Sequence, residues 1–221
     1  MPDVSCFMQQ HIAMLRKAFG QRLLYVGLQG GYARGDACAQ SDFDVMIVLD
    51  VLEVSDLARY RTMIEQTGCA EKCCGFICGK EELVHWNVLE ICQLVHETVD
   101  YVGCLRDLVP SYTREDIRQY VKYSAGNLCH ALCHTKLHGS PEALEEILLS
   151  GYKSAFYIMQ NVYFYTTGEW IPSKTALPSG LPEQGCAVLL RARELENTPQ
   201  PDPERDFSLL LQWCRRMILQ A

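Results

Sequence analysis

The residues best suited to chemistry are two glycines, Gly30-Gly31, and two aspartates in Asp42-Phe43-Asp44. Side chains on a β-strand alternate between its faces, so Asp42 and Asp44 should point the same way, about 7 Å apart. Two such carboxylates suit Mg²⁺, which takes oxygen ligands and usually keeps waters and substrate phosphates in its shell. Two glycines, which have no side chains, let the backbone approach a phosphate closely. The N–H groups at the start of a following helix would face the same phosphate. The pattern predicts a site for a nucleoside triphosphate held by Mg²⁺.

These residues need a strand, a tight turn and a second strand to position them. The apolar run Leu23–Leu28 predicts a buried strand that ends near the glycines, and Val45–Leu49 predicts a second one directly after the aspartates. Arg34 lies between the two strands and adds a cation nearby. A Gly-Gly pair alone is usually a turn, and an Asp-x-Asp alone is often a solvated strand end. The order of these elements along the chain is the more specific signal.

The rest of the first 110 residues mixes helical and strand-like patterns. Helices are predicted over Val4–Phe19, Ser55–Gln66 and Lys80–Trp86. Weaker strand patterns cover Cys74–Cys78 and Ile91–His96. The mixture predicts an α+β domain over residues 1–110, built on a small mixed β-sheet flanked by helices.

After Pro110 the pattern is helical. Thr113-Arg114-Glu115-Asp116 resembles a capping box and begins a helix that runs to about His138. Ser140-Pro141 provides a cap and a first-turn proline for a second long helix. Two further helices are predicted, over about Pro182–Asn197 and from Asp202 onward. Residues 111–221 are therefore expected to form an all-α bundle that packs against the first domain and shares a cleft with it.

Composition and charge narrow the class of protein. The chain of 221 residues is 48 % apolar and 21 % charged, which is ordinary globular usage. Its net charge of −7 disfavours bulk nucleic-acid binding, which depends on basic residues that neutralise phosphates. Apolar runs of about five residues, against the roughly 20 that span a bilayer, predict no membrane segment. With no signal-peptide pattern at the N-terminus, the expected location is the cytoplasm.

Cysteines and histidines recur without a metal-site spacing. The twelve cysteines are too sparse for a disulfide scaffold and are expected to be mostly buried free thiols. On the predicted helix 113–138, cysteines and histidines follow one another every four residues, at Cys129, Cys133, His130, His134 and His138. This spacing favours helix packing over a zinc site.

The segment Gly30–Leu49 resembles the active-site signature of the nucleotidyltransferase superfamily that includes DNA polymerase β. In that signature Gly-Ser or Gly-Gly precedes Asp-x-Asp or Asp-x-Glu. Within it, Ala33-Arg34-Gly35 and Ser41-Asp42 are similar to the minimal nucleotidyltransferases and to aminoglycoside nucleotidyltransferases of the kanamycin type. Asn161–Lys174 is similar to a helix-Thr-Gly-loop-Lys segment of the streptomycin/spectinomycin adenylyltransferases.

The resemblance implies a reaction in which an acceptor hydroxyl attacks the α-phosphorus of a nucleoside triphosphate, expected to be ATP, and pyrophosphate leaves. Asp42 and Asp44 would hold one or two Mg²⁺ ions. Nucleotide binding would fall to Gly30, Gly31, Arg34, Ser41 and, from the helical half, Lys174. The expected acceptor is a small hydroxyl-bearing molecule such as an aminoglycoside, and the expected oligomeric state is a monomer or homodimer.

The sequence departs from the family pattern at the third carboxylate. The strand expected to carry it, Cys73–Cys78, contains no acid. Glu97, at the end of the predicted strand Ile91–His96, is therefore the preferred general base, ahead of the neighbouring acids Glu71, Glu90 and Asp100. Two alternatives stay open: an antitoxin-type enzyme that adenylylates a protein, and a degenerate protein that binds nucleotide without transferring it.

Overall fold

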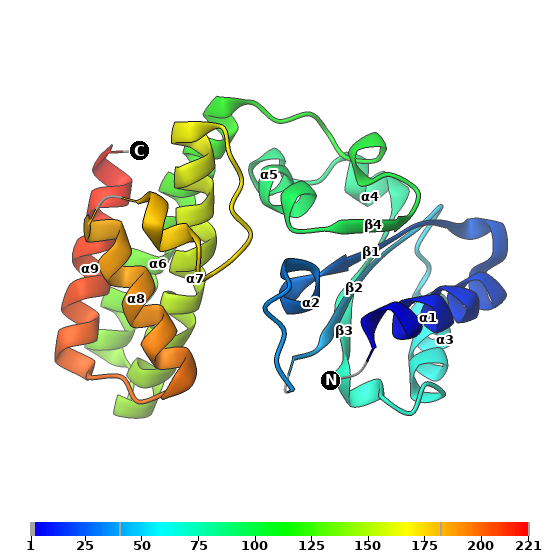
Figure 1. Ribbon diagram of the computed structural model, residues 1–221, viewed down its shortest axis with the longest axis horizontal. Coiled ribbons are helices and arrows are strands. Elements are labelled where there is room, and N and C mark those ends of the chain that lie inside the picture. Colours follow the sequence, from blue (N-terminus) through cyan, green and yellow to red (C-terminus); the bar gives the residue numbers. More distant parts are fainter. Residues whose placement is uncertain (1–2, 40, 182, 221) are drawn as a thin grey trace. The chain divides into compact units, whose positions relative to one another are not determined.

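The computed structural model describes residues 3–39, 41–181 and 183–220. The chain divides into two compact units, Met1–Ser111 and Tyr112–Ala221 (Figure 1). The first unit contains a four-stranded sheet with helices, and the described part of the second contains helices without strands. The predicted α+β fold class, a small mixed sheet followed by a helical bundle, is confirmed.

The sheet of the first unit has the strand order β3-β2-β1-β4. Its strands are β1 (Leu23–Gln29), β2 (Phe43–Leu49), β3 (Cys73–Gly79) and β4 (Val99–Val102). Strand β1 runs antiparallel to β2 and β4, whereas β2 and β3 are parallel. The first three strands coincide with predicted apolar runs. The sequence does not predict β4, because this edge strand is only four residues long and mostly exposed.

Helices cover both faces of the sheet (Figure 1). On one face, α1 (Val4–Phe19) and α3 (Val54–Glu65) pack against alternate residues of β2, from Phe43 to Leu49. On the other face, residues of α4 (Lys80–Val84), α5 (Val88–His96) and the 3-10 turn η3 (Leu105–Asp107) pack around Met46 and Val48. Because strand side chains alternate, Asp44 shares its face with Met46 and Val48.

The prediction of a strand over Ile91–His96 is wrong, because these residues belong to helix α5. The side chain of Asn87 accepts a hydrogen bond from the Leu89 N–H and caps this helix. Four of the six residues of Ile91–His96 are apolar, and a segment this short shows no period that separates a strand from a buried helix. In the structure, Ile91 and Cys92 are buried on one turn of the helix. Glu97 consequently follows a helix, and the strand β4 comes after it.

The second unit is built from four long helices, α6 (Arg114–His138), α7 (Pro141–Thr167), α8 (Glu183–Asn197) and α9 (Pro203–Gln220). The predicted capping box is confirmed: Thr113 accepts from the Asp116 N–H, and Asp116 accepts from the Thr113 N–H. Ser140 caps α7 ahead of Pro141, as predicted. The predicted start of the third helix, Pro182, lies outside the described residues.

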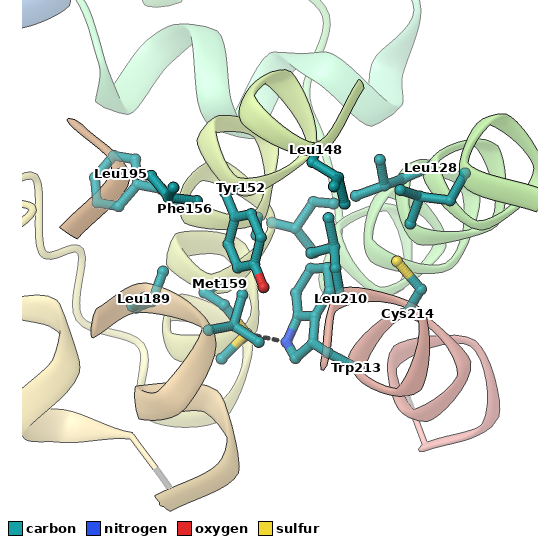
Figure 2. Close-up of a cluster of buried hydrophobic side chains, with 14 of the residues drawn as sticks. Leu128, Leu148, Tyr152, Phe156, Met159, Leu189, Leu195, Leu210, Trp213 and Cys214 are labelled. Atoms are coloured by element: carbon teal, nitrogen blue, oxygen red, sulfur yellow. Dashed lines mark hydrogen bonds between the residues drawn. The ribbon is translucent and has the colours of Figure 1, made fainter. Parts of the chain in front are cut away.

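The core of this unit is centred on Trp213 (Figure 2). Trp213 is buried, and its indole N–H donates to the sulfur of Met159 at 3.3 Å. Nearby, the buried carboxylate of Asp206 receives two hydrogen bonds from the Arg191 guanidinium, each 2.8 Å long. Tyr152 donates to the backbone oxygen of Asp206 at 3.1 Å. This network ties α7, α8 and α9 together. Within the described ranges, no helix is long and apolar enough to cross a membrane.

Candidate functional site

Gly30 and Asp44 meet where β1 ends and β2 begins. Gln29 is paired with Asp44 across the two strands, so Gly30 passes directly beside the Asp44 carboxylate. A Cβ built on Gly30 would overlap Oδ2 of Asp44 and lie 2.9 Å from its Cγ. Gly30 also has a φ of 66°, a left-handed conformation that side chains rarely adopt. Both observations require glycine at this position.

A short helix, α2 (Gly30–Arg34), begins at the two glycines and ends at Gly35, as the sequence predicts for a strand, a Gly-Gly turn and a helix. Gly31 is the second residue of α2, and a Cβ there would lie 3.3 Å from the Cα atom of Ala37. The chain that returns toward β2 therefore passes close to the start of the helix.

Phe43 determines the direction of the two aspartates. Its side chain is buried and stacks on Phe7 and Tyr32, with ring centroids 3.8 and 4.6 Å apart. Asp44, one position further along the strand, therefore points to the opposite face of the sheet. Asp42 immediately precedes the strand and is exposed, whereas Asp44 is half-buried. The two carboxylates thus flank a residue that is anchored in the core.

The position beside Asp44 on β3 is occupied by a thiol. In the parallel pairing of β2 with β3, Phe43 is paired with Cys73 and Asp44 with Cys74. Cys74 is exposed. The neighbouring strand therefore presents Cys74 next to Asp44, where the resemblance leads one to expect a third carboxylate.

Two of the alternative acids are engaged elsewhere. Asp100 lies on β4 and accepts a hydrogen bond of 2.5 Å from the Tyr25 hydroxyl. Burial, reinforced by this carboxylate, raises the pKa of Tyr25 far above its usual value, so the phenol remains a donor. Glu90 accepts the indole N–H of Trp86 at 2.7 Å. Glu71 is exposed in the 3-10 turn η2 (Ala70–Lys72) that precedes β3.

Arg34 and Glu97 form a buried ion pair between the end of α2 and the end of α5. Nη1 of Arg34 donates to Oε2 of Glu97 at 2.9 Å, and the two side chains are only 7 % and 8 % exposed. Nε of Arg34 also donates to Asp36 at 3.3 Å. Two residues predicted to serve the site independently are therefore partners of each other. This ion pair connects the end of α2 to the end of α5, and the general-base role of Glu97 stays a prediction.

Gln29 and Thr98 are neighbours of the site that the sequence reasoning missed. The side-chain amide of Gln29, the residue paired with Asp44, donates to the Thr98 hydroxyl at 2.9 Å. Thr98 in turn donates to the backbone oxygen of Leu94 in α5. The position of Gln29 just before the Gly-Gly pair was a usable signal. Thr98 had none, because the preceding helix was interpreted as a strand.

Ser41 closes the loop that leads to the aspartates. Its hydroxyl accepts the Cys38 N–H at 2.8 Å, and its own N–H donates to the Cys38 oxygen at 3.1 Å. The ammonium of Lys72 donates to the backbone oxygen of Ala39 at 3.0 Å and ties this loop to η2. The Ser41 hydroxyl thus has a structural role in the approach to Asp42, and its contact with a phosphate stays a prediction.

Lys174 belongs to the second unit. Its ammonium pairs with Glu196 and lies 5.8 Å from the centre of the Phe156 ring. Both partners are in the same unit. The predicted reach of Lys174 to a triphosphate therefore stays a prediction.

The cysteine and histidine side chains are partly packed in the protein and partly exposed, and in the described part of the chain they do not gather around a common point that could hold a metal ion. All twelve cysteines are free thiols, but only Cys78, Cys92 and Cys214 are fully buried, so the expectation of mostly buried thiols is wrong. The three histidines of α6 are exposed, with neighbouring ring centroids 6.1 and 5.0 Å apart. Across the residues that the structure describes, no three His, Cys, Asp or Glu side chains converge to hold a metal ion.

The residues at the sheet edge nevertheless fit Mg²⁺. Asp42 and Asp44 supply carboxylate oxygens, and the Asp44 carboxylate occupies the place that a Cβ on residue 30 would take. Mg²⁺ is usually held by one or two carboxylates, with waters and substrate phosphates as its other ligands. Two aspartates next to a glycine turn are therefore a suitable donor set when a phosphate group is also present.

The chain is similar in structure to spectinomycin adenyltransferase AAD(9) from Enterococcus faecialis, solved with ATP and spectinomycin. The TM-score is 0.64 at 13 % sequence identity, and the match covers 99 % of this chain and 100 % of the other. At this identity the likeness shows a shared fold. Comparisons with protein-family profiles and with curated proteins find no match.

Proposed function

We propose that this protein is a nucleotidyltransferase that moves AMP from ATP to a hydroxyl of a small-molecule acceptor and releases pyrophosphate. The observation that carries the proposal is the contact of the Gly-Gly turn with the Asp-x-Asp strand, where Gly30 meets Asp44. The fold shared with AAD(9), solved with ATP and spectinomycin, supports the same donor and an aminoglycoside-like acceptor. The net charge of −7 favours a cationic acceptor of this kind.

Asp42 and Asp44 would hold Mg²⁺ between the protein and the phosphates. When bound, Mg²⁺ neutralises the charge that develops on the phosphate oxygens. The acceptor oxygen forms a bond to the α-phosphorus, the bond from that phosphorus to the leaving pyrophosphate breaks, and the hydroxyl proton passes to solvent water. The chain's own contribution is positioning: Gly30, without a Cβ, leaves room for the Asp44 carboxylate, and the Arg34–Glu97 pair holds α2 against α5.

A specific observation favours a second candidate function, nucleotide binding without transfer. The strand next to the Asp-x-Asp presents Cys74 beside Asp44, and the acids considered as replacements are engaged in other contacts or lie on η2. A site without a third carboxylate would still bind a nucleotide through Mg²⁺ and the glycine turn. This candidate differs from the first in one observable, the release of pyrophosphate.

Thermal unfolding with each of the four nucleoside triphosphates, with and without Mg²⁺, tests the proposal. A ligand at a hundred times its Kd stabilises the folded state by about 2.7 kcal/mol, which raises the Tm by about 5–10 °C at this chain length. We expect ATP to raise the Tm by this amount when Mg²⁺ is present and to leave the Tm unchanged when Mg²⁺ is absent. No shift with any nucleotide would contradict both candidates. A shift without pyrophosphate release, across a panel of aminoglycosides and other polyols, would select nucleotide binding without transfer.

Glu97→Gln should lower stability and weaken nucleotide binding together. The substitution removes the charge that pairs with Arg34 inside the unit, and loss of a charged hydrogen bond costs about 1–3 kcal/mol. The released α2 would then hold the Gly-Gly turn less firmly. Urea unfolding and the ATP-dependent Tm shift measure the two effects.

The matched control is Asp36→Asn, which removes the longer and more exposed of the two Arg34 partners and should have a smaller effect on both. A general-base role for Glu97 gives a different pattern. Turnover would fall about 10²–10⁴-fold, with stability and nucleotide affinity unchanged, and that result would reject the positioning role.

A further inference from the structure

A cavity of about 270 Å³ lies within the second unit, between α7 and α8. Its walls are apolar: Tyr152 and Phe156 come from α7, and Leu189 and Leu195 come from α8. Figure 2 shows Leu189, Leu195 and Phe156 on one side of the core, with Tyr152 between them and Trp213. The cavity therefore extends the hydrophobic core to the surface of the unit.

The polar groups that line this cavity are mainly cationic. They are Lys153, Lys174 and Arg193, against the single carboxylate of Glu196. Lys174 is paired with Glu196. The charged groups of Lys153 and Arg193 are exposed and have no hydrogen bond or ion pair among the residues that the structure describes. These two cations give the mouth of the cavity a local positive charge, although the net charge of the chain is −7.

We propose that this cavity binds a small amphiphilic anion, with an apolar chain or ring against Phe156 and Leu195 and an anionic head at Lys153 and Arg193. Apolar walls with a few placed charges are typical of ligand sites. The volume equals that of about nine waters at about 30 Å³ each, which is room for a ligand of about ten non-hydrogen atoms. The two cations would repel an aminoglycoside, so this is a different ligand from the proposed acceptor. The inference does not depend on the proposed function.

Isothermal titration calorimetry with octanoate tests this site, with octan-1-ol and octylamine as neutral and cationic probes of the same chain length. We expect octanoate to bind at least tenfold more tightly than octan-1-ol and octylamine to bind most weakly. The double variant K153Q/R193Q should weaken octanoate binding about tenfold and leave octan-1-ol binding unchanged. The matched control K122Q/R215Q removes two charges of the same kind outside the cavity lining and should leave all three affinities unchanged.

The variant Ala192→Phe tests the cavity independently of the charges. Ala192 lines the cavity, and a phenyl group at this position would fill it. Octanoate and octan-1-ol binding should both be lost, with the circular dichroism spectrum unchanged. Equal weakening in K122Q/R215Q would show a general charge effect and overturn the proposal, as would the absence of octanoate binding to the wild type. Displacement of octanoate by ATP with Mg²⁺ would also overturn it, by assigning the cavity and Lys174 to the nucleotide.

Discussion

Asp44→Asn should reduce Mg²⁺-dependent nucleotidyl transfer by at least about 10³-fold, a loss of about 4 kcal/mol of transition-state stabilisation. Asp42→Asn should have a similar effect. Asparagine preserves the shape of the side chain but removes the negative charge that makes a carboxylate a good Mg²⁺ ligand. Both positions lie at the start of β2, and the neighbouring Phe43 anchors the strand in the core, so the fold should persist. Pyrophosphate release measures the loss.

Two controls separate loss of the metal from other effects. Glu71→Gln removes one negative charge from an exposed acid on η2, which precedes the neighbouring strand β3, and should leave transfer within about twofold. The Tm without ligand should stay close to that of the wild type in both Asn variants, while the shift with ATP and Mg²⁺ disappears in Asp44→Asn. Full transfer activity in both Asn variants would exclude the metal assignment.

Gly30→Ala should disrupt the site more than its one added carbon suggests. The added Cβ would overlap Oδ2 of Asp44. The alanine would also have to adopt the left-handed φ of 66°, or the turn would have to change its backbone conformation. Left-handed conformation alone costs a non-glycine residue about 1–2 kcal/mol. Displacement of the Asp44 carboxylate adds to this cost and removes one of the two proposed Mg²⁺ ligands. We expect a lower free energy of unfolding and at least a 10²-fold loss of transfer, comparable to loss of a catalytic group.

Gly35→Ala is the matched control, because Gly35 also has a positive φ, 78°, but a Cβ there has no atom within 4 Å. Both variants place an alanine in a left-handed backbone conformation, but only in Gly30→Ala does the added Cβ overlap the Asp44 carboxylate. Urea unfolding and the Tm shift with ATP and Mg²⁺ should therefore separate them. If the two variants lose nucleotide binding equally, strain in the turn, and not contact with Asp44, would account for the glycine at position 30.

Local patterns were sufficient to predict most elements of the fold. The apolar runs of β1 and β2 are long enough to be recognised as buried strands, and the glycines between them indicate the turn. Helix α6 was predictable because its capping box is encoded in four consecutive residues, Thr113 to Asp116. The prediction failed where the pattern was ambiguous. The short, only partly apolar segment Ile91–His96 of α5 was interpreted as a strand, and the exposed edge strand β4 had no recognisable pattern.

The residues suited to binding a metal and a phosphate, and the two strands and the turn that carry them, can be identified from the sequence because they depend on neighbours a few positions apart. The contacts that these residues make depend on the tertiary structure. It paired Arg34 with Glu97, set Cys74 beside Asp44 and brought Lys174 to Glu196. Each of these contacts joins residues at least 22 positions apart. Such contacts depend on strand register and on the packing of separate helices, which no local spacing encodes.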